Sequence, residues 1–355
     1  MAAGGTAGHV VPAMAVADEL RASGAEVSFL GTRERIEAEL VPAAGYEIDY
    51  VRVRGIDRRN AVRAARAGAE AVAATGTALR ALRRRRADVV LGGGGFVAGP
   101  AGLAAVLSRT PLVLTEADSH LGLANRLLAG RARTVCLSFP IAGREGGRYV
   151  VTGRPVPAAV LEADRARARE RFGIGLEERC VLVMGGSQGA RSINECALAA
   201  FAEREARDFA VVHLSGRRDF DGLERRLAAA LYKERYTLLP YEPNLGDCLA
   251  ACDLVVGRSG GSIFELTAAG RPAVLVPYPH AAAGHQTTNA AWMEEAGAAA
   301  VIRDEELEAG LLAAKVRELL GDDERLTAMT AAAAALAMPD AARRIADLVL
   351  EAMSR

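Results

Sequence analysis

Residues 257–291 bring small loop residues, one acid and two side-chain amides into a single stretch of strand and helix patterns. An apolar run at 253–256 ends at a glycine, and the next residues are small enough for a diphosphate to approach the backbone: Ser259, Gly260, Gly261 and Ser262. A helix begins there, and the N–H groups at its start carry partial positive charge that can hold an anion without a metal ion. Glu265, one turn into that helix, is placed to accept hydrogen bonds from two ribose hydroxyls.

Beyond the next strand, Gln286 and Asn289 lie at i, i+3 spacing, so they share one face of a helix. Two side-chain amides at that spacing suit the hydroxyls of a sugar. Each residue alone also fits an ordinary strand-to-helix turn or a solvated helix position, and for any one of them that alternative is favoured. The whole set is more than such a turn needs, so the stretch predicts a nucleotide-sugar pocket.

A second glycine turn opens the chain at residues 4–8 and ends at His9. Glycine spacing alone is a weak signal. His9 is a candidate general base because its unperturbed pKa lies near neutrality and it can take a proton from a sugar hydroxyl. The alternative is a histidine that only caps the loop. Removal of a true base is expected to lower the rate on the order of a hundredfold or more.

Two further loops follow apolar strand patterns in the first half of the chain. Four glycines at 92–95 precede Phe96 and permit close backbone approach and positive φ angles. Their position at the carboxyl end of a strand favours a binding role over a flexible surface loop. The strand pattern at 112–114 is followed by polar side chains that can bind or react, namely Glu116, Asp118, His120 and Asn125.

Together these motifs resemble those of the MurG family, the glycosyltransferases that add N-acetylglucosamine to a membrane-bound muramyl pentapeptide precursor of peptidoglycan. Residues 185–190, GGSQGA, match the family motif of the same letters, and this match is specific. Residues 4–9, GGTAGH, are similar to the family's GGTGGH, and 92–96 are similar to its acceptor-side GGY/F motif. Residues 115–118, TEAD, depart from the commonest family pattern, His-Glu-Gln-Asn, and keep only Glu116.

The resemblance implies a set of site residues. Ser187 and Gln188 would touch the phosphate or sugar of the donor, and main-chain groups at Glu242 would read uracil. The implied catalytic residues are His9 and Glu116. The implied donor-binding residues are Thr6, Ala7, Gly8, Arg154, Ser187, Gln188, Glu242, Ser259, Gly260, Gly261, Ser262, Ile263, Phe264, Glu265, Gln286 and Asn289. The implied acceptor-binding residues are Gly93, Gly94, Gly95, Phe96, Asp118 and Asn125, with the glycines assigned to the lipid diphosphate.

Apolar runs typical of strands alternate with helical patterns along the whole chain. They lie at 27–30, 48–53, 89–91, 112–114, 135–137 and 149–151, and then at 181–186, 211–214, 238–239, 254–256, 273–276 and 299–302. This rhythm predicts an α/β chain with doubly wound parallel sheets, and 355 residues suit two such domains. The resemblance implies the GT-B fold, two Rossmann-like domains with a ligand cleft between them.

We expect an N-terminal acceptor and membrane-side domain at 1–153 and a C-terminal UDP-sugar donor-binding domain at 154–339. The last helix, within 340–355, is expected to pack back on the first domain. Only three residues precede the first glycine turn, where a central parallel strand usually has about five. Either the native chain starts upstream of Met1 or this strand is short.

Composition excludes several functions. The formal net charge is zero and no basic strip is interleaved with aromatics, which argues against a nucleic-acid partner. Five cysteines without metal-ligand spacing indicate buried free thiols, and no apolar run has the length of a membrane span. Residues 219–221, DFD, spell the signature of metal-dependent glycosyltransferases but are typical of a helix start near arginines. No metal and no cofactor are expected.

Nine arginines between 58 and 86 form either a solvated helical face or a surface for anionic lipid. A lipid-linked acceptor favours the second, so we expect a peripheral protein on the cytoplasmic side of the cell membrane. The expected reaction is inverting and metal-independent. The muramyl 4-hydroxyl, deprotonated by His9 or a nearby carboxylate, displaces UDP from C1 of UDP-N-acetylglucosamine. Such a step serves cell wall biogenesis and thereby cell shape, division and the cell cycle.

Three alternatives remain open. A GT-B glycosyltransferase acting on another lipid, such as diacylglycerol, would keep the donor side, and the altered segment 115–118 is compatible with it. A UDP-N-acetylglucosamine 2-epimerase needs an array of acids and histidines around the sugar, and this chain has only five histidines. A nucleotide-binding module without catalysis would tolerate the loss of His9 and Glu116.

Overall fold

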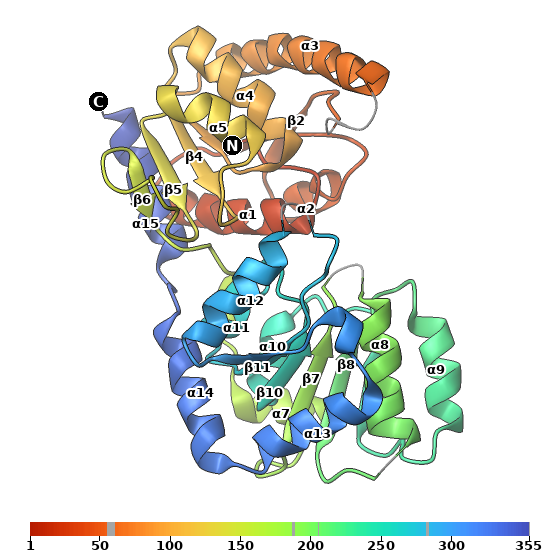
Figure 1. The fold of residues 1–355 in the computed structure, drawn as a ribbon. Helices are drawn as coiled ribbons and strands as arrows, with labels where there is room; N and C mark the ends of the chain where they lie inside the picture. The colour runs from red at the N-terminus through yellow and green to blue at the C-terminus, as the bar shows by residue number, and fades with distance from the viewer. Residues whose placement is uncertain (55–60, 187–188, 205, 282–283, 355) are drawn as a thin grey trace. The chain divides into compact units, whose positions relative to one another are not determined.

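The structure is a computed structural model that describes residues 1–54, 61–186, 189–204, 206–281 and 284–354, with only the backbone described at 61–67. The chain forms two compact units, Met1–Pro157 with Met338–Arg355 and Ala158–Ala337 (Figure 1). The breaks lie close to the expected boundaries. Arg154, however, falls in the first unit, whereas a boundary after residue 153 had placed it in the second.

The first unit is built on a parallel sheet. Its strands are β1 (Ser28–Gly31), β2 (Glu47–Tyr50), β3 (Val90–Gly92), β4 (Leu112–Glu116), β5 (Thr134–Leu137) and β6 (Tyr149–Val151). The first two strands pair with each other, and the last four pair in chain order. Ala2 bridges Leu30 on one side and Gly92 on the other, so it joins the two groups of strands. This one bridging residue occupies the centre of the sheet.

Helices cover both faces of this sheet. They are α1 (Ala7–Ala22), α2 (Glu37–Ala43), α3 (Ala61–Arg85), α4 (Gly95–Ser108), α5 (Leu123–Leu128), the short 3-10 helix η1 (Ala129–Arg131) and α15 (Ala341–Met353). Leu112 and Leu114 pack on the side of α4 and α5, whereas Val113 packs on the side of α1 and α15. This alternation follows from the two-residue repeat of a strand.

The second unit repeats the same architecture. Its parallel strands are β7 (Cys180–Met184), β8 (Ala210–Leu214), β9 (Tyr236–Leu239), β10 (Leu254–Gly257), β11 (Ala273–Leu275) and β12 (Ala299–Val301). They lie in the order β9-β8-β7-β10-β11-β12. When the Ala2 segment is counted as a strand, the first unit has the order β2-β1-Ala2-β3-β4-β5-β6. Both sheets therefore start in the middle and grow outward in both directions, as in Rossmann-like folds.

The second unit has its own set of helices. They are α6 (Ala158–Leu161), α7 (Arg165–Phe172), α8 (Arg191–Leu198) with its π-helical extension η2 (Ala199–Glu203), α9 (Phe220–Ala229), α10 (Leu245–Ala251), α11 (Ile263–Ala268), α12 (His285–Glu295), η4 (Asp304–Glu306), α13 (Ala309–Leu320) and α14 (Asp323–Ala335). Valines of the central strands pack against α8, α13 and α14 and form one large apolar core. This core supports the strands whose ends carry the candidate site.

A buried ion pair ties α7 to the start of two central strands. The Arg169 side chain is 1% exposed and donates to Oδ2 of Asp253 over 2.9 Å. The same guanidinium donates to the carbonyl oxygens of Gly175 and Glu178, and Asp253 accepts from the backbone N–H of Cys180. Since the charges satisfy one another and the surrounding backbone, the pair is compatible with burial.

The predictions for the strands, the cysteines and Asp219 can be compared directly with the fold. All the expected strands are present, and the five cysteines are buried free thiols. Asp219 is the N-cap of α9 and pairs with Arg218, as a helix-start residue should. Across the described residues, no helix has the length and apolarity needed to cross a membrane. Within the same residues, no group of three potential ligands is arranged to hold a metal ion.

Candidate active site

Each sheet has one point where the strand order reverses. In the first unit it lies between the Ala2 segment and β3, and in the second between β7 and β10. Loops diverge at such a point, so ligands of open parallel sheets bind there, beyond the carboxyl ends of the strands. The four glycine-rich motifs all follow these strands, at 4–8 and 92–95 in the first unit and at 185–189 and 257–262 in the second. The fold thus brings the predicted motifs together in pairs, one pair in each unit.

The two glycine loops of the first unit touch each other through their backbones. A Cβ atom on Gly95 would lie 2.0 Å from the carbonyl oxygen of Gly4, which no side chain tolerates. A Cβ atom on Gly94 would lie 2.4 Å from Cδ2 of His9. Gly94 and Gly95 also have φ angles of 97° and 73°, in the region that favours glycine. The glycine run is therefore required both by backbone conformation and by the space that His9 occupies.

His9 lies in the first turn of α1, whose N-cap is Thr6. Its Nδ1 atom is 3.2 Å from Oγ1 of Thr6. With the proton on Nδ1 and donated to this hydroxyl, Nε2 is left as the acceptor that a general base needs. Burial lowers the pKa of His9, the Arg154 charge lowers it further, and Asp118 and Glu37 oppose this by raising it. The neutral ring is favoured near neutral pH, which is the form of a base.

The residues around His9 include most of those expected on this loop. Arg154 donates from its guanidinium to the carbonyl oxygen of Gly8. Thr6 and Gly8 are exposed, and Ala7 is half-buried. A role of these residues in donor binding stays a prediction. The structure adds that Arg154 acts on the same turn as His9, which the sequence did not indicate.

Glu116 and Asn125 are placed in the interior of the loop after β4. Glu116 is 6% exposed and accepts from the N–H of Gly122 over 2.8 Å, the N–H of Asp118 over 3.2 Å and Nδ2 of Asn125 over 2.9 Å. Burial raises the pKa of Glu116, and these hydrogen bonds lower it. Asn125 also donates to the carbonyl oxygen of Thr115. Both side chains hold the loop in shape, whereas Asp118 is half-buried on it.

The first glycine loop of the second unit leads from β7 to α8. A Cβ atom on Gly185 would lie 2.2 Å from the backbone nitrogen of Ala190, and one on Gly189 would lie 2.2 Å from the carbonyl oxygen of Ser215. Close backbone packing therefore requires glycine at both positions. Ser187 and Gln188, the residues predicted to touch the donor, lie outside the described residues.

The second glycine loop, after β10, presents backbone donors. The N–H groups of residues 260–262 have no acceptor among the described residues. Because α11 has only six residues, the positive potential here comes from these amides themselves and not from a long helix dipole. Ile263 and Phe264 are 0% and 5% exposed, so only their backbone atoms can reach a ligand. Glu265 is half-buried in the first turn of the helix.

Helix α12 braces this loop and the segment after β11. Nδ2 of Asn289 donates to the carbonyl oxygen of Ser259 over 2.9 Å, and Oγ of Ser259 donates to the carbonyl oxygen of Gln286 over 2.7 Å. Oε1 of Gln286 accepts from the N–H of Tyr278 over 2.9 Å. The Asn289 amide thus holds the glycine loop after β10, and the Gln286 amide holds the segment after β11. Oδ1 of Asn289 is buried and has no partner among the described residues.

Arg258 was not among the predicted site residues, although it stands within the same loop. Its guanidinium donates to Oδ1 of Asp304 over 2.6 Å, to Oγ of Ser192 over 2.8 Å and to the carbonyl oxygen of Val276 over 3.0 Å. It therefore joins the ends of β10 and β11 to the start of α8. The sequence signal for this role was weak: a lone arginine among small residues after a buried strand. Its partners lie far from it along the chain, so spacing does not reveal them.

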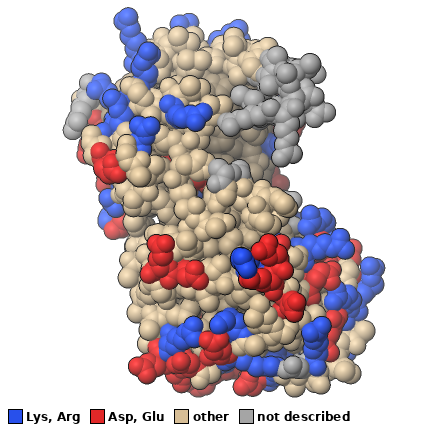
Figure 2. Space-filling model, viewed as in Figure 1, with Lys and Arg blue, Asp and Glu red and all other residues tan. Residues whose placement is uncertain are grey.

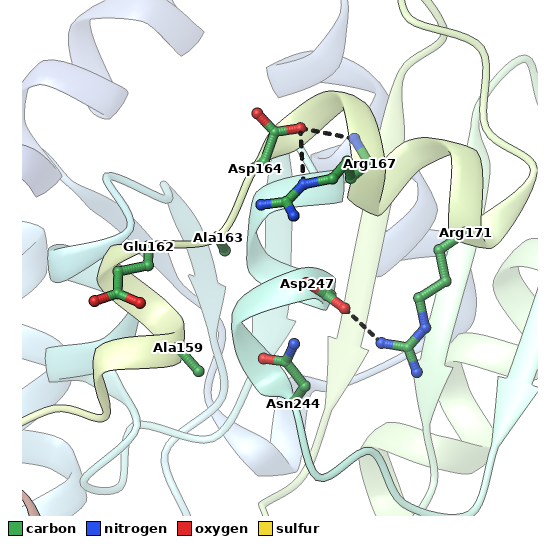
Figure 3. A pocket seen from close by; sticks show the side chains of 8 residues that line it. All are labelled: Ala159, Glu162, Ala163, Asp164, Arg167, Arg171, Asn244 and Asp247. Carbon is green, nitrogen blue, oxygen red and sulfur yellow. Dashed lines mark hydrogen bonds and ion pairs between the residues drawn. The ribbon is translucent and has the colours of Figure 1, made fainter.

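Glu242 has its carboxylate turned into the protein. Oε2 accepts from Arg171 over 2.5 Å, and Oε1 accepts from the N–H of Asn244 over 2.9 Å. This leaves the backbone of the segment for a ligand, which is the role the resemblance implied. A groove of about 410 Å³ borders the segment on α6, α7 and α10 (Figure 3), and it contains none of the predicted site residues. Its lining is Ala159, Glu162, Ala163, Asp164, Arg167, Arg171, Asn244 and Asp247.

Comparison with known proteins agrees with this architecture. Residues 1–137 match the glycosyltransferase family 28 N-terminal domain, and residues 180–345 match the glycosyltransferase family 28 C-terminal domain. A relative from Moorella thermoacetica is 42% identical over 98% of this chain and 97% of its own length. It is named UDP-N-acetylglucosamine–N-acetylmuramyl-(pentapeptide) pyrophosphoryl-undecaprenol N-acetylglucosamine transferase.

Two solved structures show how far the likeness extends. The crystal structure of Acinetobacter baumannii MurG superposes with a TM-score of 0.77 at 30% identity, covering 99% of this chain and 98% of the other. A UDP-N-acetylglucosamine 2-epimerase superposes with a TM-score of 0.69 over 100% of this chain and 96% of the other, but at 14% identity. The likeness to the epimerase concerns the fold alone.

Two parallel α/β domains with glycine loops at both switch points define a glycosyltransferase of the GT-B fold. Within this class, the family is identified by the 42% identity to the Moorella thermoacetica relative over 98% of this chain. The chain belongs to the MurG family of N-acetylglucosamine transferases.

Proposed function

We propose that the chain transfers N-acetylglucosamine from UDP-N-acetylglucosamine to the 4-hydroxyl of a muramyl pentapeptide linked to undecaprenyl pyrophosphate. The product is the disaccharide precursor of peptidoglycan, so the step serves cell wall biogenesis and, through it, cell shape, division and the cell cycle. The observation that carries the proposal is family membership over nearly the whole chain, with a relative of that activity 42% identical over 98% of it.

In this proposal the second unit binds the donor. The N–H groups of residues 260–262 hold the diphosphate, and Glu265 holds the ribose. Ser187 and Gln188 add contacts from the loop after β7, and the backbone at Glu242 reads the uracil. Binding through backbone donors keeps their positions fixed, and preorganised dipoles stabilise the charge that develops on the leaving diphosphate.

The first unit binds the acceptor and supplies the base. Nε2 of His9 takes the proton of the muramyl hydroxyl while that oxygen attacks C1 of the donor sugar and UDP leaves, which inverts the configuration at C1. Gly93, Gly94 and Gly95 with Phe96 contact the lipid diphosphate, and Asp118 contacts the sugar. Thr6, Ala7, Gly8 and Arg154 surround the reacting centre.

Glu116 takes a different part from the catalytic one expected from the sequence. Both of its oxygens accept hydrogen bonds from its own loop. We therefore assign Glu116 and Asn125 to positioning of Asp118. In this assignment Glu116 and Asn125 remain part of the site, but Glu116 positions Asp118 and does not take part in catalysis.

The first unit also carries the proposed membrane surface. Exposed apolar side chains stand on the neighbouring helices α3, α4 and α5, namely Val72, Leu103, Leu107 and Leu127. Exposed arginines lie on the same helices or at their ends, namely Arg83, Arg86, Arg109 and Arg126. Figure 2 shows basic side chains along the upper edge of this unit. Apolar groups that enter the headgroup region beside cations that attract anionic lipid give reversible peripheral binding. Arg58 and Arg59 of the basic stretch lie outside the described residues.

The activity is tested with purified protein, labelled UDP-N-acetylglucosamine and the lipid-linked muramyl pentapeptide, in the presence of EDTA. We expect a labelled lipid-linked disaccharide and one UDP for each transfer. UDP release without the disaccharide would exclude the proposed acceptor. Transfer to diacylglycerol instead would support the runner-up lipid acceptor, and conversion of the donor to its 2-epimer would support an epimerase.

Membrane binding is tested by co-sedimentation with vesicles of anionic or zwitterionic lipid. The double variant Leu103→Glu with Leu107→Glu is expected to lose binding to anionic vesicles. Leu231→Glu is the matched control because Leu231 is 77% exposed on the second unit. Equal binding by both variants would refute the assignment of this surface.

A further inference from the structure

Glu37 is a buried acid that the proposed reaction has not used. It is the first residue of α2 and is 0% exposed. Its Oε2 accepts from the N–H of Gly5 over 3.0 Å. Its Oε1 accepts from the N–H of Thr32 over 3.0 Å and from the hydroxyl of Thr32 over 2.7 Å. The carboxylate therefore links the glycine loop that carries His9 to the end of β1.

Two glycines make room for this side chain. A Cβ atom on Gly4 would lie 2.7 Å from Oε1 of Glu37, and one on Gly31 would lie 2.7 Å from its Cγ. Among the described residues, no cation forms an ion pair with Glu37. A buried carboxylate without a counter-ion lowers stability unless it is hydrogen-bonded, and here backbone and hydroxyl donors take that part.

Glu37 also acts on the pKa of His9. Three charged side chains act on the imidazole: Arg154 from the segment after β6, Asp118 from the loop after β4 and Glu37 from α2. The glycine loop at the start of α4 contributes no charged side chain. Arg154 and burial lower the pKa of His9, and the two acids raise it. Asp118 has the larger of the two effects, and Glu37 is the buried acid, held in place by its hydrogen bonds.

We propose that Glu37 is the positioning residue of His9: it fixes the glycine loop that carries His9 through the N–H of Gly5, and its charge acts on the imidazole. The inference rests on the proposed function only in so far as His9 is the base of the transfer reaction. It extends the site to a residue that neither touches the substrate nor belongs to a glycine motif.

The test compares Glu37→Gln with Thr32→Val. Glu37→Gln keeps the size of the side chain and removes its negative charge. It also places an amide N–H₂ group against one of the groups that donate to Glu37, the N–H of Gly5 or Thr32. Thr32→Val removes one hydrogen bond from the same carboxylate and keeps the charge, so both are expected to lower the melting temperature by a few degrees. The pKa of His9 is measured in each protein by NMR titration of labelled histidine, with His9→Gln to assign the signal.

We expect the pKa of His9 to fall in Glu37→Gln and to stay unchanged in Thr32→Val. The acid limb of the pH profile of kcat/KM moves to lower pH in the first variant only. Its kcat falls on the order of tenfold, because the loop that carries the base is displaced, with the donor KM little changed. An unchanged His9 pKa in Glu37→Gln, or an equal shift in both variants, would overturn the inference.

One further outcome separates this inference from the proposed function. If the His9 pKa falls in Glu37→Gln while the pH profile does not move, Glu37 positions His9 and His9 is not the base. Should Glu37→Gln fail to fold, Glu37→Asp takes its place. The shorter side chain keeps the charge but does not reach the N–H of Gly5, so kcat falls while the ring still titrates near the wild-type pKa. A wild-type kcat in Glu37→Asp would overturn the positioning role.

Discussion

Replacement of Gly94 by alanine tests whether the position of the His9 ring matters for catalysis. The new methyl group would lie 2.4 Å from Cδ2 of His9, whereas ordinary contacts begin at 3.4 Å. The ring or the loop must therefore move by about 1 Å, the difference between these two distances. A displacement of about 1 Å at a catalytic group is associated with losses on the order of a hundredfold in rate.

The backbone adds a separate effect on stability. Gly94 has a φ of 97° and a ψ of 179°, a combination that is open to glycine and strained for alanine. This strain is expected to lower the free energy of unfolding by about 1–3 kcal/mol. Gly45→Ala is the matched control, since Gly45 in the same unit has a φ of 77° and nothing within 4 Å of its Cβ position. It shares the positive φ without the collision.

The assay is steady-state UDP release at saturating donor and acceptor, with urea denaturation of each variant in parallel. We expect Gly45→Ala to lose stability and keep kcat, and Gly94→Ala to lose stability and about two orders of magnitude in kcat. A kcat of Gly94→Ala within twofold of wild type would show that His9 need not stand where the structure has it. A matching loss in Gly45→Ala would assign the effect to backbone strain instead.

Three further changes test the supports of the site. Arg169→Met removes the buried partner of Asp253, which keeps its ion pair with Arg165, and is expected to lower the free energy of unfolding by about 1–3 kcal/mol in urea denaturation; an unchanged free energy of unfolding would contradict the burial argument. Asn289→Ala removes the hydrogen bond to the second glycine loop and is expected to raise the donor KM about tenfold at unchanged kcat, so a fall in kcat alone would speak against it. Because Arg154 lowers the pKa of His9, Arg154→Ala is expected to move the acid limb of kcat/KM to higher pH, and a shift to lower pH would reverse the assignment.

The sheets were predictable because strands that are buried on both faces appear in a sequence as continuous apolar runs. Continuous apolar runs between helical patterns predicted every strand, and the glycines after β3, β7 and β10 marked their carboxyl ends. The centre of the first sheet was less clear, since a single bridging residue, Ala2, takes the place of a strand. A segment this short has no periodicity to detect.

The site was predictable where backbone chemistry decides it and less so where side chains do. The glycine motifs could be recognised because close backbone approach requires glycine at several of their positions, such as Gly95, Gly185 and Gly189. The spacing of Gln286 and Asn289 predicted that they share one helix face. It did not predict that each side-chain amide forms a hydrogen bond to a neighbouring loop, Gln286 to Tyr278 and Asn289 to Ser259. That choice depends on Ser259 and Tyr278, whose approach to α12 is a product of the tertiary fold.

Glu37 and Arg258 show the limit of sequence reasoning. Glu37 stands in a run of charged residues, RERIEAEL, that is typical of a solvated helix start. It is buried only because Gly4 and Gly31, on separate strand ends, leave a space for its side chain. Arg258 meets Asp304 across the ends of several strands. Neither partnership has a spacing rule that a single sequence reveals.

The last helix has a consequence for how the protein is made. Side chains of α15, among them Ile345 and Val349, cover Val16 of α1 and Val113 of the first sheet. The ribosome therefore synthesises all of the second unit before the first can close its core. Until then the nascent chain exposes an apolar face on α1 and β4. Incompletely folded domains with exposed apolar surface are prone to aggregate. The N-terminal half is begun first and finished last, which makes chaperone protection during synthesis more important for it than for the C-terminal half.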